Sequence, residues 1–382
     1  MIQTTLPAED SGCGRLFAAL ELSNKKWKLA MSARGKKREV TVPAGNMAAL
    51  LEAFDKAKAH FKLDGAASVM SCYEAGRDGF WLHHELDRVG VENLVVDSSS
   101  IEVDRRQRRA KTDRLDAWRL LRQLERYAEG DRRALRIVRV PSVEAEDARR
   151  PHRELQRLRE ERTAQANRIR GLLVLHGLRL TVGPRFPQQL SEMVVEGGGP
   201  VRAHLHAELV REFARWQLVS EQIKVLEAEL DAQLQAEAAT DPAVHTIQKL
   251  CRLRAVGIMS ATVFTREFFG WRDFRNRREV GGASGLVNMP FASGDRSSDQ
   301  GISKAGNRRV RTTLIQIAWG WLRYQPESAL SQWFQKRFAA SARLRRIGIV
   351  ALARRLLIAL WRYVEKDLVP VGAQLKPVPT NA

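Results

Sequence analysis

Four acidic residues stand out by their positions next to apolar runs and on one helix face. Glu21 ends an apolar run that begins at Leu16, Glu74 follows a second such run, and Asp113 and Asp116 share one face of an expected helix. A charge in a buried strand is costly unless it is paired or coordinated. Converging carboxylates can hold two divalent ions about 4 Å apart for phosphoryl transfer. We therefore take Glu21, Glu74, Asp113 and Asp116 as candidate catalytic residues and as ligands for Mg²⁺ or Mn²⁺.

Each acid also has a purely structural interpretation. Glu21 could pair with a nearby lysine, Asp113 could favour a helix start through the helix dipole, and Asp116 could pair with a neighbouring arginine. A joint role is favoured by the order of the elements that carry the four acids.

The elements around the acids predict an α/β domain over residues 15–135, after a disordered lead at 1–14. Three apolar runs separated by turn residues indicate an antiparallel meander, and strands then alternate with helices. This is the element order of an RNase H-like domain. Strands are expected at 16–20, 27–31, 39–42, 66–72 and 91–96, and helices at 46–60, 78–89 and 113–127.

The rest of the chain is predicted to be mainly helical. Residues 141–240 hold two long charged segments with helical periodicity, which predict a helical hairpin or coiled coil. Residues 245–370 form a predicted carboxy-terminal domain with a loop over 281–301, where Gly and Ser are frequent. Residues 371–382 are expected to be a loose tail. Helices of the carboxy-terminal domain are expected near 247–269, 308–324 and 344–364.

The charge of the chain indicates a polyanionic partner. The sequence holds 64 Lys and Arg against 44 Asp and Glu, a net charge of +20, and nucleic acid is the commonest partner of such proteins. No apolar run approaches the roughly 18 residues of a spanning helix, and the start is unlike a signal peptide. The three cysteines form no C-x-x-C pair, which disfavours a zinc finger. We expect a cytoplasmic, nucleoid-associated prokaryotic protein that does not bind membranes.

Two basic clusters are candidate nucleic-acid-binding sites because few acids balance them. One precedes the pair of aspartates and the other surrounds the start of a carboxy-terminal helix. A third cluster, from Arg149 to Arg170, is partly balanced by acids, so a solvated helix face explains it equally well. The first two clusters are Arg105, Arg106, Arg108, Arg109 and Lys111, and Lys304, Arg308, Arg309 and Arg311.

Several motifs together resemble the DEDD transposases of insertion sequences, which are relatives of the pilin gene-inverting recombinase. The segment Lys111–Ala117 resembles the family's aspartate motif, and Tyr73–Gly76 resembles the motif that carries its glutamate. In the carboxy-terminal region, Ser284–Val287, Ala292–Gly294 and Gly301–Arg311 strengthen the match. The resemblance covers nearly the whole chain.

The resemblance implies an amino-terminal domain like that of the RuvC Holliday-junction resolvase, a coiled-coil middle and a carboxy-terminal transposase domain. Family members use the DEDD acids with Mg²⁺ and a serine that forms a phosphoserine link with DNA; by position this serine is Ser293. Studied relatives are guided by an element-encoded RNA that pairs with donor and target DNA. The expected partners are therefore DNA, a guide RNA and further copies of the chain, as a dimer or tetramer.

One position departs from the family pattern. The first acid of the family is usually Asp, whereas this chain has Glu21, whose extra methylene moves the carboxylate by about one bond length. Two other functions stay open. The four acids could hydrolyse DNA with water, as in a junction resolvase, with Ser293 a plain turn residue. The chain could also be a nucleic-acid-binding element product without catalysis, which the change at Glu21 would favour.

Overall fold

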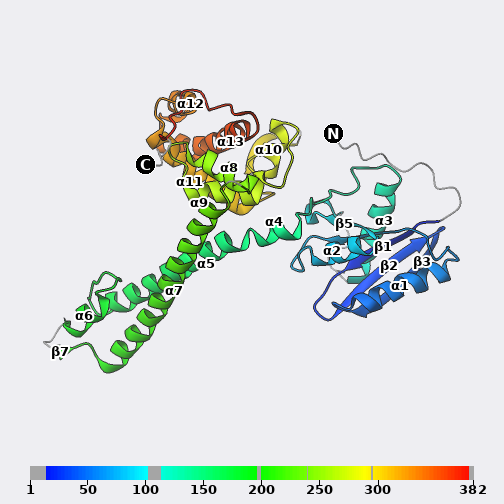
Figure 1. The fold of residues 1–382 in the computed structure, drawn as a ribbon, viewed down its shortest axis with the longest axis horizontal. Helices are drawn as coiled ribbons and strands as arrows, with labels where there is room; N and C mark the ends of the chain where they lie inside the picture. Colours follow the sequence, from blue (N-terminus) through cyan, green and yellow to red (C-terminus); the bar gives the residue numbers. More distant parts are fainter. Residues whose placement is uncertain (1–13, 102–112, 196–198, 239, 294–295, 378–382) are drawn as a thin grey trace. The chain divides into compact units, whose positions relative to one another are not determined.

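A computed structural model describes residues 14–101, 113–195, 199–238, 240–293 and 296–377. These residues form two compact units, which divide between Val143 and Glu144 (Figure 1). The predicted lead before Gly14 lies outside the described residues. So does the first basic cluster, which consists of Arg105, Arg106, Arg108, Arg109 and Lys111.

A mixed five-stranded sheet is the centre of the first unit (Figure 1). Its strands are β1 (Leu16–Glu21), β2 (Lys26–Ala33), β3 (Lys36–Pro43), β4 (Val69–Glu74) and β5 (Glu92–Val96). The order across the sheet is β3-β2-β1-β4-β5. The first three strands form the predicted antiparallel meander, and β4 and β5 run parallel to β1. The predicted α/β character of this part of the chain is confirmed.

Helices cover both faces of the sheet. Because side chains alternate along a strand, Leu20 packs with α1 (Met47–His60) and α2 (Trp81–Arg88), whereas Ala19 packs with α3 (Asp113–Ala128) on the opposite face. The sheet is therefore the middle layer of three, and its two faces have separate apolar cores.

Helix α3 runs antiparallel to β1. Trp118 Nε1 donates a hydrogen bond to Glu39 Oε2 at 2.9 Å, and Glu39 is level with Ala19 in the middle of β1. Later in α3, Glu125 Oε1 accepts a hydrogen bond from Ser32 Oγ at 2.5 Å, and Ser32 lies opposite the first half of β1. The start of α3 therefore lies toward the end of the sheet where β1 and β4 finish.

Two long helices dominate the first part of the second unit. Helices α5 (Arg150–Val174) and α7 (Ala203–Ala236) lie side by side (Figure 1). They run antiparallel, because Arg159 pairs with Glu227 whereas Arg168 pairs with Glu212. For these arginines of the third basic cluster, the ion pairs favour the structural interpretation. Buried side chains join the two helices: Leu155, Leu158, Val219 and Ile223 in one cluster, and Ile169, Leu209 and Phe213 in another.

The rest of the second unit is helical around one large apolar core, with one two-stranded sheet, β8 and β9. The predicted loop over 281–301 is wrong in part, because this segment contains the end of a helix and a β-hairpin. Helix α12 was not predicted. The elements are α8 (Pro242–Cys251), α9 (Ile258–Phe264), the π-helical η3 (Thr265–Phe269), α10 (Arg277–Ala283), β8 (Asn288–Ser293), β9 (Arg296–Ile302), α11 (Arg308–Tyr324), α12 (Ala329–Phe338) and α13 (Ala342–Lys366).

Short elements complete the description of the chain. They are η1 (Ser98–Ser100), α4 (Val143–Asp147), α6 (Phe186–Ser191), β6 (Val194–Val195) and β7 (Gly199–Pro200). Among the helices that the structure describes, none is both long and apolar enough to span a bilayer.

Candidate functional site

Two of the predicted acids end neighbouring parallel strands in the first unit. Glu21 is the last residue of β1 and Glu74 is the last residue of β4, and the residues before them are in register. Two positions earlier on each strand, Ala19 and Cys72 pack in the core that includes α3. Because side chains alternate along a strand, Glu21 and Glu74 both belong to the face of the sheet that α3 covers.

The two aspartates lie in the first turn of α3. Each precedes a buried residue of α3 by four positions, Asp113 before Ala117 and Asp116 before Leu120. Residues four apart share a helix face, so Asp116 continues the stripe of α3 that faces the sheet. The Asp116 carboxylate lies 3.4 Å from Arg119 and is 24% exposed. The side chain of Asp113 lies outside the described residues.

The chemistry of these donors suits a hard divalent cation, because Mg²⁺ and Mn²⁺ prefer carboxylate oxygens. Glu74 is exposed and Glu21 is half-buried. Among the side chains that the structure describes, no three acids, histidines or cysteines lie close enough together to hold a metal ion. The elements of the predicted site thus meet at one end of the sheet, but the described carboxylates do not by themselves close around a cation.

One further acid lies near this end of the sheet. Asp97 follows β5, and its Oδ1 accepts hydrogen bonds from the amide and hydroxyl groups of Ser99 at 2.9 and 2.8 Å. Arg136 Nε lies 3.7 Å from the other carboxylate oxygen. These contacts make Asp97 the cap of η1, which is a structural role.

The predicted nucleophile of the second unit lies where the first strand of a β-hairpin ends. Ser293 is the last residue of β8 and pairs with Arg296, the first residue of β9. The predicted loop over 281–301 is therefore wrong for the backbone of Ser293. Its side chain lies outside the described residues.

Two glycines allow the backbone to pack closely at the base of this hairpin. Gly285 has φ +70°, and a Cβ atom there would lie 1.9 Å from the Ala305 carbonyl oxygen. Gly306 has φ +88°, and a Cβ atom there would lie 2.1 Å from the Ala283 carbonyl oxygen. Only glycine tolerates both the left-handed backbone and this approach. The Lys304 amide also donates to the Gly285 carbonyl at 3.1 Å, so the two segments that flank the hairpin are held together.

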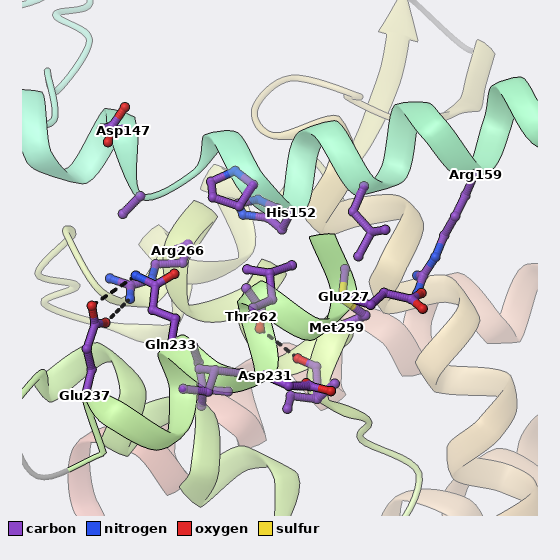
Figure 2. Close-up of a pocket in the computed structure, with 17 residues that line it drawn as sticks. Asp147, His152, Arg159, Glu227, Asp231, Gln233, Glu237, Met259, Thr262 and Arg266 are labelled. Atoms are coloured by element: carbon purple, nitrogen blue, oxygen red, sulfur yellow. Dashed lines mark hydrogen bonds and ion pairs between the residues drawn. The ribbon is translucent and has the colours of Figure 1, made fainter. Parts of the chain in front are cut away.

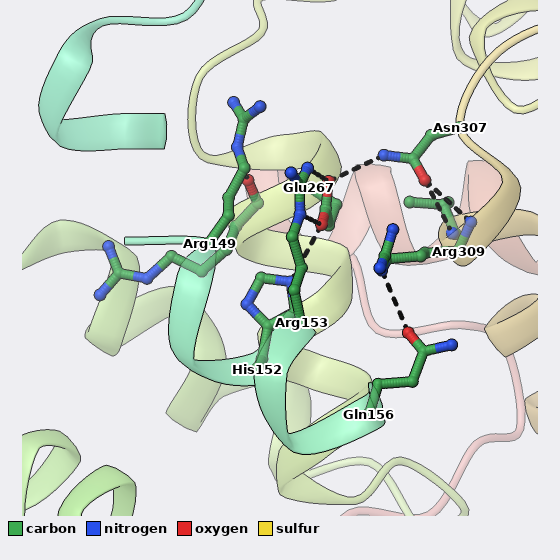
Figure 3. A network of polar contacts seen from close by, with 9 residues as sticks. Arg149, His152, Arg153, Gln156, Glu267, Asn307 and Arg309 are labelled. Carbon is green, nitrogen blue, oxygen red and sulfur yellow. Dashed lines mark hydrogen bonds and ion pairs between the residues drawn. The ribbon is translucent and has the colours of Figure 1, made fainter. Parts of the chain in front are cut away.

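A buried carboxylate connects α5 to the segment that follows the hairpin (Figure 3). Glu267 lies in η3 and its side chain is fully buried. Arg153 donates from Nε and Nη2 to the two carboxylate oxygens at 2.6 and 2.7 Å. His152 Nε2 lies 3.0 Å from Oε1, and Asn307 Nδ2 donates to Oε2 at 2.9 Å. We call Glu267, Arg153, His152 and Asn307 the Glu267 cluster.

Asn307 has a second role in this cluster, because it also caps α11. Its side-chain oxygen accepts hydrogen bonds from the amides of Arg309 and Val310 at 2.9 and 3.2 Å. Arg309 Nε in turn donates to Gln156 Oε1 on α5 at 3.1 Å (Figure 3). One asparagine therefore joins the helix start after the hairpin to the buried Glu267.

The Glu267 cluster is held by an ionised carboxylate. Burial alone would raise the pKa of Glu267, but hydrogen bonds from Arg153 and His152, the charge of Arg153 and the bond from Asn307 together lower this pKa well below the usual carboxyl range. Glu267 is therefore a permanent negative charge at neutral pH, which suits a structural anchor better than a proton-transfer group.

A cavity of about 390 Å³ lies between α5, α7 and α9 in the same unit (Figure 2). Its lining combines apolar side chains with charged ones, and the arginines are paired: Arg159 with Glu227 at 2.6 Å, and Arg266 with Asp241 at 2.7 Å. These ion pairs connect separate helices, which favours a structural role for the charges in this cavity.

The second basic cluster divides into two kinds of residue. Arg311 Nη1 donates to the Ser284 carbonyl at 3.3 Å, so this side chain is used at the base of the hairpin. Lys304 and Arg308 are exposed, and Arg309 is half-buried beside α5. The exposed members, which lie around the start of α11, can contact a polyanion.

The comparisons with known proteins agree on one family. A profile described as the transposase IS116/IS110/IS902 family matches residues 247–332, which include η3, the hairpin and α11. A putative transposase, y4rJ, of Sinorhizobium fredii is 41% identical over 95% of this chain and 95% of its own. A probable family 20 transposase of Pseudomonas aeruginosa is 30% identical over 62% of this chain and 68% of its own. The chain therefore belongs to the IS116/IS110/IS902 family of transposases, enzymes that cleave and rejoin DNA.

Proposed function

We propose that this transposase cuts and rejoins the DNA of an insertion sequence through a phosphoserine intermediate on Ser293. The observation that supports this most is the construction of the β8–β9 hairpin, whose first strand ends at Ser293. Its base is held by the close contacts of Gly285 and Gly306, and the residue after that base, Asn307, is bonded to the buried Glu267. A nucleophile on a well-supported backbone can be positioned accurately against a phosphate.

The proposed reaction has two balanced steps. In the first, the Ser293 oxygen bonds to the scissile phosphorus, the bond from phosphorus to one DNA oxygen breaks, the serine gives up its proton and the leaving oxygen gains one. In the second, a DNA hydroxyl attacks the phosphoserine, a new DNA phosphodiester forms, and the serine oxygen leaves and is protonated again. The number of phosphodiester bonds is conserved, so no energy source is consumed.

A serine hydroxyl must be activated by a base or a metal ion. We propose that the first unit supplies this activation and is an RNase H-like, RuvC-like domain; its strand order and the position of α3 over β1 support the assignment. Glu21, Glu74, Asp113 and Asp116 would hold Mg²⁺ or Mn²⁺, which when bound polarises the phosphate and lowers the pKa of a coordinated oxygen.

Nucleic acids are the proposed partners, and the net charge of +20 supports this proposal. The exposed residues at the start of α11, together with the basic residues that precede Asp113, would contact DNA and an element-encoded guide RNA. The reaction joins two DNA partners, so we also propose that the active form is a homo-oligomer.

The test is a covalent-adduct assay with the full chain and DNA that contains the element ends. Wild type should form an adduct that survives denaturation and depends on Mg²⁺. Ser293→Ala should remove the adduct without weakening DNA binding, whereas Ser298→Ala, a matched change in β9 of the same hairpin, should leave the adduct intact.

The same assay separates the competing functions. An adduct that persists in Ser293→Ala would refute the serine assignment. Mg²⁺-dependent cleavage without an adduct, unchanged in Ser293→Ala but lost in Asp116→Asn, would indicate a resolvase-like nuclease. Binding without cleavage in the wild type would indicate a non-catalytic element product.

A further inference from the structure

A polar groove of about 840 Å³ lies between α5, α9 and α11 in the second unit. One face of α5 forms one wall and one face of α11 forms the other. On each wall the lining positions recur at three- and four-residue intervals, which is the spacing of a single helix face. The polar wall residues include Gln156, Thr163 and Asn167 on α5, and Arg309, Thr313 and Gln316 on α11.

The groove is open because the helices present these polar faces to each other. The apolar sides of both helices are used elsewhere: Leu158 packs against α7, and Leu314 packs in the main core of the unit. Neighbouring helices normally interdigitate apolar side chains where they face each other. Here the facing positions are hydroxyls, amides and guanidinium groups, and the bond from Arg309 to Gln156 is a direct contact across the groove.

The chemistry of the lining suits a sugar–phosphate backbone. Arg308 and Arg309 place positive charge at the start of α11, and hydroxyl and amide donors continue along both walls. Arg, Thr, Asn and Gln are the side chains that contact phosphate oxygens in nucleic-acid complexes. Apolar side chains of Met259 and Val263 also line the groove and can contact the sugar. The acid in the lining, Glu160, accepts a hydrogen bond from Gln156 at 2.9 Å.

We propose that this groove binds the sugar–phosphate backbone of a nucleic-acid strand, and that it extends the contact surface from the start of α11 onto α5. This inference rests on the proposed function, because it takes nucleic acid as the partner and identifies the surface of the second unit that would bind it. Backbone recognition predicts affinity that depends on salt and not on base sequence.

The first test measures the binding of labelled oligonucleotides of arbitrary sequence to the full chain by fluorescence anisotropy, without divalent metal. The variant Asn167→Asp with Gln316→Glu changes two exposed amides into acids of the same shape. We expect this variant to bind about tenfold more weakly, because each new charge faces a phosphate, and the loss should shrink as salt screens it. The control, Gln189→Glu with Gln335→Glu, adds the same charge at exposed positions outside the groove and should stay within twofold of wild type.

A second test identifies where the strand lies. A photo-crosslinking benzoylphenylalanine replaces the exposed Thr163 in the groove or, as a control, Gln335 on α12. Crosslinking at position 163 and not at 335 is expected, and separate single-stranded DNA, duplex DNA and RNA arms show which nucleic acid occupies the groove. The proposal is wrong if Asn167→Asp with Gln316→Glu binds like wild type, if the control double variant loses as much affinity, or if position 163 crosslinks no oligonucleotide. Because these readouts need no cleavage, they can succeed where the Ser293 adduct fails, and the reverse.

Discussion

Replacing Glu267 with Gln tests whether the charge of the Glu267 cluster stabilises the second unit. The substitution keeps the size of the side chain and removes its charge. The amide keeps one oxygen that can accept a hydrogen bond from Arg153. Its NH₂ group replaces the other carboxylate oxygen, so a donor there faces a donor of Arg153 or Asn307. The change therefore breaks the two-pronged contact without opening a cavity.

The expected loss follows from the contacts. Removing one partner of a buried ion pair costs about 3–5 kcal/mol. The side chain of Arg153 is 40% exposed, so water offsets part of this loss, and one hydrogen bond remains. We expect a loss of about 2–3 kcal/mol in the free energy of unfolding. For a unit of this size, that corresponds to a decrease in Tm of roughly 4–12 °C.

The assay is calorimetry of the full chain, which allows the two units to unfold in separate transitions. Glu221→Gln is the matched control, because Glu221 is exposed and pairs with Lys224, three residues along the same helix. A double-mutant cycle with Arg153→Met should give a coupling energy of at least about 1 kcal/mol. Equal Tm values for Glu267→Gln and the control, or a coupling energy near zero, would refute the reasoning.

The same pair of proteins should differ with pH. Since the pKa of Glu267 is lower in the folded chain than in the unfolded chain, its charge stabilises the fold fully above the unfolded value, about 4.3. The contribution is lost as pH falls from there toward the folded pKa. The stability difference between wild type and Glu267→Gln should therefore be constant from pH 6 to 7 and shrink below pH 4, and a difference that grows in acid would contradict the assignment.

Three further pairs of substitutions test other parts of the molecule. Gly306→Ala should destabilise the second unit by about 2 kcal/mol or more, because it combines positive φ with a backbone clash; Gly301→Ala, at positive φ in open space, should cost less in the same melting assay. Leu121→Ala, in the core under α3, should cost about 2–5 kcal/mol in urea unfolding, whereas the exposed Leu115→Ala should cost less than about 0.5. Glu21→Asp should keep or raise Mg²⁺-dependent cleavage if this acid is a metal ligand, and Glu21→Gln should abolish it.

The amino-terminal fold was largely predictable because its elements have strong periodicity. The apolar runs located the strands, and their ends moved by a few residues for local reasons. Strand β3 begins at Lys36, not at 39, because an edge strand can continue with exposed polar residues. Helix α2 begins at Trp81, not at 78, and Gly79 at φ +69° lies just before this start.

The β8–β9 hairpin, which contains Ser293, was not predictable in the same way. Residues 281–301 contain many Gly and Ser, so they lack the alternation that marks a strand. Their structure depends on contacts between segments about twenty positions apart, such as Gly285 with Ala305 and Gly306 with Ala283. A local pattern can identify a glycine, but it does not identify the backbone that the glycine approaches.

Glu267 was missed although a usable signal was present. It lies in the mainly apolar and aromatic segment from Val263 to Phe269, which also holds Thr265 and Arg266, and a buried charge is costly unless it is paired. The same argument singled out Glu21. What the sequence could not supply was the partners, because Arg153 is 114 positions away and Asn307 is 40.

The glycine contacts and the Glu267 cluster act on the same short segment from two directions. Gly306 is held against α10 by its close approach to Ala283, and the next residue, Asn307, is held by Glu267, which Arg153 on α5 also binds. Moving the start of α11 relative to α5 would therefore break the hydrogen bond from Asn307 to the buried Glu267 and also open a backbone contact. At the other end of the hairpin, the backbone of Ser293 is paired with Arg296 of β9. Because Asn307 and Glu267 support the base of this hairpin, Glu267→Gln should loosen the positioning of Ser293 while leaving the exposed basic residues at the start of α11 in place. We therefore expect Glu267→Gln to slow adduct formation more than it weakens DNA binding.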